Sequence, residues 1–82
     1  MTKPKILISE DEVIIAEDLA ASLEELGYET CAIDSGEDTI DMIRETQPDL
    51  VLLDINLRGE TDGVEIGSRI KQEFGIPFIY LT

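Results

Sequence analysis

Apolar positions along the chain follow two spacings, one typical of buried strands and one typical of amphipathic helices. Four short runs rich in Ile, Leu, Val, Phe or Tyr predict strands over residues 5–9, 28–33, 50–54 and 77–81. The three segments between them carry apolar residues every three or four positions and predict helices. The predicted order is therefore βαβαβαβ.

Each predicted helix has an apolar face and recognisable ends. The first spans residues 12–26 and stops at Gly27, the second ends before Pro48, and the third stops at Gly75. Ser35 with Asp38, and Asp62 with Glu65, form capping-box patterns that start the second and third helices. The residues expected to face the core are Ile15, Ala16, Leu19, Ala20, Leu23 and Leu26 in the first helix, Ile40 and Ile43 in the second, and Val64, Ile66, Ile70 and Phe74 in the third.

This alternation predicts a single α/β domain with a parallel sheet, right-handed crossovers and helices on both faces. The run Leu50–Leu53 is apolar at every position, as expected of a strand buried between two helix layers. With 82 residues the chain has room for one small domain, and its hydrophobic fraction of 43% is normal for a globular core.

The composition excludes several classes of ligand and of catalytic mechanism. The formal net charge of −13 argues against binding to nucleic acid or to an anionic membrane. Zero histidines exclude Ser-His-Asp and Cys-His catalysis and histidine-bound zinc, while the single cysteine, Cys31, cannot form an internal disulfide. No apolar run approaches the roughly 20 residues of a membrane helix, and no signal peptide is apparent. A cytoplasmic protein using carboxylate or hydroxyl chemistry is predicted.

Polar residues follow three of the predicted strands. Glu10 and Asp11 follow the first, Asp54 ends the third, and Thr82 follows the fourth. Ligands of open parallel sheets bind at the carboxyl ends of the strands, near the reversal of strand order. If the first and third strands are neighbours, three carboxylates converge there and require a hard divalent cation such as Mg²⁺. Asp54 would then be the nucleophile that accepts a phosphoryl group.

Other interpretations of these residues remain open. The acidic run at residues 10–12 also suits the first turn of a helix, and an aspartate commonly ends a strand. Residues 54–65 nearly match a calcium-binding EF-hand loop, but Arg58 stands at a ligand position and a strand precedes the loop. An aspartate-nucleophile phosphatase would need an acid where Asn56 stands. A flavin or nucleotide binder would need a Gly/Ser/Thr-rich loop in place of the acidic run.

The chain resembles the receiver domain of two-component response regulators across essentially all of its length. Four motifs carry the resemblance: Ile-Leu-Ile-Ser-Glu-Asp-Glu, Pro-Asp-Leu-Val-Leu-Leu-Asp-Ile-Asn-Leu, Asp-Gly-Val-Glu-Ile and Ile-Pro-Phe-Ile-Tyr-Leu-Thr. It implies a flavodoxin-like, doubly wound sheet of strand order 2-1-3-4, and a signalling domain that is not an enzyme. It further implies that a histidine kinase or phosphotransfer protein phosphorylates Asp54, that Glu10, Asp11, Asp54 and the backbone carbonyl of Asn56 hold Mg²⁺, and that Thr82 is the switch hydroxyl.

The chain departs from the family pattern in two places. The loop at residues 56–63 is one residue longer than usual, with Arg58 where proline is common. Residues 1–82 also match only the N-terminal portion of such a domain, without its final strand, its lysine and its last two helices. The fourth strand would then be an apolar edge that could pair in a homodimer. A receiver-like interaction module that is never phosphorylated is therefore the alternative function.

Overall fold

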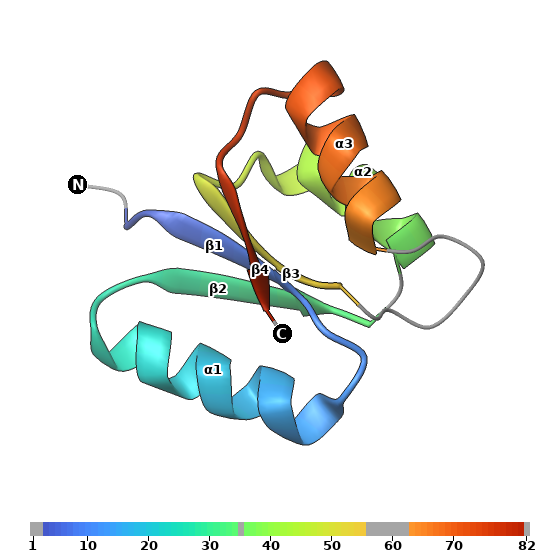
Figure 1. Ribbon diagram of the computed structural model, residues 1–82. Coiled ribbons are helices and arrows are strands. Elements are labelled where there is room, and N and C mark those ends of the chain that lie inside the picture. Colours follow the sequence, from blue (N-terminus) through green and yellow to red (C-terminus); the bar gives the residue numbers. More distant parts are fainter. Residues whose placement is uncertain (1–2, 35, 56–62, 82) are drawn as a thin grey trace.

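The computed structural model describes residues 3–34, 36–55 and 63–81, and in residues 36 and 37 the backbone only. Four strands and three helices alternate along the chain (Figure 1). The elements are β1 (Lys5–Ser9), α1 (Val13–Glu25), β2 (Glu29–Ile33), α2 (Gly36–Thr46), β3 (Leu50–Asp54), α3 (Gly63–Glu73) and β4 (Phe78–Leu81). The predicted order βαβαβαβ is confirmed. The first helix was predicted one residue too long at each end, and the second and fourth strands were predicted to start one residue too early.

The strands form one parallel sheet in the order β2-β1-β3-β4, which confirms the predicted flavodoxin-like topology. In Figure 1, α1 covers one face of the sheet and α2 and α3 cover the other. Ser9 is aligned with Leu53 in the β1–β3 register. The residues that follow on these two central strands, Glu10 and Asp54, therefore leave the sheet side by side.

The core has two layers because successive strand residues point to opposite faces. Leu7, Val51 and Leu53 pack with Ile40, Ile43, Ile66 and Ile70 beneath α2 and α3. On the other face, Ile6, Ile8 and Leu52 pack with Ala16 of α1. The central strands β1 and β3 thus bury both faces, and their ends are held rigidly by the two layers.

Three residues predicted to face the core are exposed: Ile15 (43%), Leu26 (74%) and Val64 (55%). Leu26 lies beyond the last residue of α1, at its C-cap. Val64 is off the buried stripe of α3, in which glycines hold two of the four positions: Gly63, Ile66, Gly67 and Ile70. Ile15 borders a hollow on the α1 face of the sheet, described below. Prediction from apolar residues alone misplaced the stripe of α3 because glycine carries no apolar signal.

Candidate functional site

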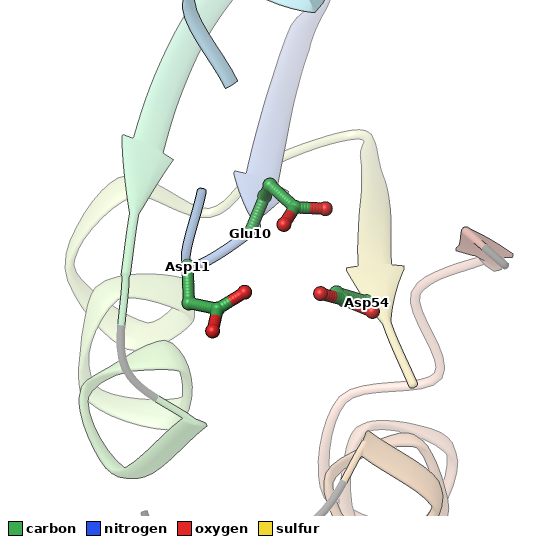
Figure 2. Close-up of side chains that lie close together, drawn as sticks. All are labelled: Glu10, Asp11 and Asp54. Carbon is green, nitrogen blue, oxygen red and sulfur yellow. The ribbon is translucent and has the colours of Figure 1, made fainter. Parts of the chain in front are cut away.

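Three carboxylates converge at the carboxyl ends of the two central strands (Figure 2). Glu10 and Asp11 follow β1, and Asp54 is the last residue of β3. Each can place one oxygen so that all three oxygens lie within 4.8 Å of one another. Glu10 is buried, with 6% of its surface exposed, whereas Asp11 and Asp54 are half-buried. The structure thus brings together the three side chains that the sequence predicted to meet.

Hydrogen bonds to neighbouring backbone fix the direction of Glu10. Its own N–H donates to the carbonyl of Ile33, the last residue of β2, at 3.0 Å. Its carboxylate Oε1 accepts the N–H of Glu12 at 3.1 Å, directly before α1 begins. The acidic run therefore precedes the helix rather than forming its first turn, and Glu10 satisfies one of the free N–H groups at the helix start.

Burial raises the pKa of the Glu10 carboxyl above its usual value of 4.5. The N–H of Glu12 opposes this shift, while the charge of Asp54 and hydrogen bonding to Asp54 and Asp11 add to it. The folded chain therefore binds a proton at Glu10 more tightly than the unfolded chain does. This contribution to stability is present at low pH and is lost as the pH rises through the raised pKa.

A cation at this site must compete with that proton. We expect the apparent affinity for Mg²⁺ to fall as the pH drops through the raised pKa of Glu10, because the cation requires the carboxylate form. Titration with Mg²⁺ followed by amide chemical shifts, at pH values from about 4.5 upward, measures this. Affinity that does not change over this range would contradict the assignment of Glu10 to the cation site.

The first residue of α3, Gly63, packs against the backbone of Asp54 and Ile55. A Cβ atom added to Gly63 would overlap the carbonyl oxygen of Asp54 and would lie 2.6 Å from the Cα of Ile55. The N–H of Gly63 donates to the carbonyl of Ile55 at 3.3 Å. The helix can approach the end of β3 this closely only because residue 63 has no side chain. Sequence reasoning placed Gly63 in a motif but did not give it this role.

A hollow of about 660 Å³ opens beside the carboxylates on the α1 face of the sheet. Its polar wall carries the three converging carboxylates and Glu12, and its apolar wall comes from α1 and β4. The lining residues are Glu10, Asp11, Glu12, Ile15, Leu19, Asp54, Tyr80 and Leu81. A group that approaches Asp54 from this side reaches the carboxylate without crossing the core.

Two other predicted site residues, Asn56 and Thr82, lie outside the described residues, as do most of the loop at residues 56–63 and the caps Ser35 and Asp62. Asp34, which follows β2 at the edge of the sheet, lies outside the carboxylate group. The residues that lead to Asp54 form strand β3, where an EF-hand would have a helix, and this contradicts the calcium-loop alternative.

No helix in the described parts of the chain is long and apolar enough to span a bilayer.

Residues 6–82 match the response regulator receiver domain family, and the chain belongs to it. The signal receiver domain of a modulated diguanylate cyclase from Desulfovibrio desulfuricans G20 is similar, at 38% identity over 96% of this chain and 64% of that chain, with a TM-score of 0.90. The BeF3-activated N-terminal receiver domain of RstA from Klebsiella pneumoniae gives 31% identity over 95% and 66%, with a TM-score of 0.90.

A third similar structure is the N-terminal domain of a response regulator receiver protein from Methanoculleus marisnigri JR1, at 37% identity, over 95% of this chain and 65% of that chain, with a TM-score of 0.88. The chain thus spans about two thirds of the length of these solved structures. Family membership makes the chain a signalling module of two-component systems. Receiver domains generally bind Mg²⁺ through an acidic cluster, and the carboxylate group of this chain is such a cluster.

Proposed function

We propose that Asp54 accepts a phosphoryl group in a reaction that depends on Mg²⁺, with a histidine kinase or phosphotransfer protein as donor. The observation that carries this proposal is the convergence of Glu10, Asp11 and Asp54, whose oxygens lie within 4.8 Å of one another. Family membership supports the class of donor, since receiver domains generally interact with these proteins. Cytoplasmic location follows from the same proposal.

The donor set fits Mg²⁺ by its chemistry. All three side chains offer carboxylate oxygens, which this hard cation prefers, and two of them are partly open to solvent, so the cation can keep waters or phosphate oxygens. When bound, Mg²⁺ would supply positive charge that offsets the charge of the carboxylates and of the transferred group. By resemblance, the backbone carbonyl of Asn56 would complete the protein ligands.

The chain's own residues then have distinct tasks. An Asp54 oxygen attacks the phosphorus, the P–N bond of the donor phosphohistidine breaks, and the imidazole nitrogen keeps the bonding pair and takes up a proton. The product is an acyl phosphate on Asp54. Glu10 and Asp11 would hold the cation, and Glu10 is kept in position by its two hydrogen bonds to backbone. By resemblance, the Thr82 hydroxyl would contact the phosphoryl oxygens.

Acetyl phosphate tests the acceptor without a kinase. With Mg²⁺ present, the intact mass of the chain should increase by one phosphoryl group, and no increase should occur when EDTA is present from the start of the reaction. A folded sample that gains no mass with acetyl phosphate and Mg²⁺ would overturn the proposal and favour the alternative of an interaction module that is never phosphorylated.

A second proposal concerns assembly through β4. Among the described residues, β4 has a neighbouring strand only on the β3 side, and Ile79 at its centre is 55% exposed. An apolar edge strand pairs readily with another chain. A homodimer through β4 would cover this edge.

Light scattering at increasing concentration measures this assembly. We expect a dimer for the unmodified chain and a monomer for Ile79→Lys, because a charge on the exposed centre of the strand opposes pairing. Glu29→Lys on the opposite edge strand, β2, is the matched control and should leave the dimer intact. A monomer at every concentration would contradict the proposal.

A further inference from the structure

One polar pair is buried in the otherwise apolar layer beneath α2 and α3. The Ser9 and Thr39 hydroxyl oxygens are 2.8 Å apart, within hydrogen-bond distance, and neither residue has any exposed surface. Ser9 is the last residue of β1 and shares the face of Leu7, while Thr39 lies in the first turns of α2, next to the core residue Ile40. The pair therefore joins two elements that are separate in the sequence.

Hydroxyl groups are unusual at such positions because a buried hydroxyl without a partner costs about 1–3 kcal/mol. In the described part of the chain every buried side-chain oxygen or nitrogen has a partner. Two small apolar residues would fill the same space without this requirement. A hydrogen bond is directional, so the pair fixes the position of α2 relative to β1, whereas apolar contact alone would let the two elements slide past each other.

Ser9 lies directly before the carboxylate site, so its hydrogen bond to α2 bears on how that site is held. Ser9 is followed at once by Glu10 and Asp11, which leave the sheet towards Asp54 (Figure 2). The contacts that hold this turn include the Ser9 hydroxyl to α2, the Glu10 N–H to Ile33 of β2, and the Glu10 carboxylate to the N–H of Glu12. Only the first of these depends on side chains outside the acidic run.

We infer that Ser9 and Thr39 are positioning residues for the cation site: their hydrogen bond sets the direction in which Glu10 and Asp11 leave β1. The inference rests on the proposed function, because it concerns the Mg²⁺ site of that proposal. Groups that orient a metal ligand directly are worth about 10- to 100-fold in metal affinity. Ser9 and Thr39 act through the backbone, one step further away, so a loss of about three- to tenfold is expected.

Near-isosteric variants separate positioning from stability. In Ser9→Ala, Thr39→Val and the double variant, we expect Mg²⁺ affinity, measured by amide chemical shifts, to fall by about three- to tenfold. The double variant should lose no more than the single ones, because all three lack the same hydrogen bond. Its melting temperature should stay close to that of the unmodified chain, since replacing both partners by apolar groups of the same shape is nearly neutral.

Two further variants complete the test. Thr39→Ser retains a hydroxyl and should keep most of the Mg²⁺ affinity. Thr46→Val removes a hydroxyl at the other end of α2, where Oγ1 donates to the Met42 carbonyl at 2.7 Å, and should leave the affinity unchanged. Equal affinity in the unmodified chain and the Ser9→Ala/Thr39→Val variant would overturn the inference alone. An unmodified chain that binds no Mg²⁺ would overturn the proposed function and this inference with it.

Discussion

Asp54→Asn is expected to abolish phosphorylation by acetyl phosphate and to raise the melting temperature of the chain in the absence of Mg²⁺. The first effect follows because an amide oxygen is not a nucleophile that can form the acyl phosphate. The second follows because the substitution removes one of three like charges whose oxygens lie within 4.8 Å of one another. Loss of function and gain of stability in one variant would mark Asp54 as a functional residue.

The size of the stability gain can be estimated. Two unit charges about 4 Å apart interact by about 4 kcal/mol at an effective dielectric constant of about 20. Asp54 is half-buried, so solvent screens much of this repulsion, and we expect a gain of about 1 kcal/mol. In a domain of this size, that corresponds to roughly 4–8 °C in melting temperature. With Mg²⁺ present the gain should shrink, because the cation offsets the same repulsion in the unmodified chain.

The matched control is Asp34→Asn, the same substitution at the end of β2. Asp34 is exposed and lies outside the carboxylate group. We expect normal phosphorylation and little change in melting temperature. If Asp54→Asn still gained one phosphoryl group, the acceptor would lie elsewhere in the chain and the proposed mechanism would be wrong.

Gly63→Ala is expected to destabilise the fold and to slow phosphorylation together. In an ordinary helix position this substitution stabilises by about 1 kcal/mol. Here the new Cβ would overlap the carbonyl oxygen of Asp54 and would lie 2.6 Å from the Cα of Ile55. Both neighbours are backbone atoms, so α3 must move away or the end of β3 must shift. We expect a net loss of about 1–3 kcal/mol in the free energy of unfolding, as for overpacked cores.

The effect on phosphorylation follows from the same contact. Asp54 and the atoms that meet the new Cβ belong to one short stretch of backbone, so relief of the clash displaces the nucleophile. A displacement of about 1 Å can slow a reaction by about 100-fold. Urea denaturation measures the loss of stability. The rate of mass increase with acetyl phosphate, measured without urea under conditions in which the variant is fully folded, measures the displacement of Asp54.

Gly67→Ala is the control for this variant, one helical turn further along α3. Its Cβ would meet the hydroxyl of Tyr80 and would lie 2.9 Å from the Phe78 ring. These are side chains of β4, whose rings pack edge-to-face with centroids 5.3 Å apart. We expect a loss of stability with a phosphorylation rate close to that of the unmodified chain. Equal slowing by both variants would show that general destabilisation, rather than displacement of Asp54, is responsible.

The fold and the centre of the site were predictable because their signals are strong and local. Alternating apolar runs gave the order of the elements and a parallel sheet, whereas the strand order 2-1-3-4 came from the resemblance to receiver domains. Three acids at strand ends gave the carboxylate group once the first and third strands were taken as neighbours. The polar character of Ser9 was visible in an apolar run, but its partner Thr39 lies 30 positions away, and nothing in the spacing relates the two. The prediction that Ile15 and Val64 face the core was wrong, because the exposure of a helix residue depends on which neighbouring elements cover the helix.

The position of β1 between β2 and β3 has a consequence for how the chain folds. The unit β1–α1–β2 can assemble from the first 33 residues, whereas Asp54 reaches Glu10 only after β3 has docked on the other side of β1. Closing this longer loop costs more chain entropy, so we expect β3 to dock after β2. On this order, charge repulsion in the carboxylate group arises when the docked β3 already buries Val51 and Leu53 and can tolerate it.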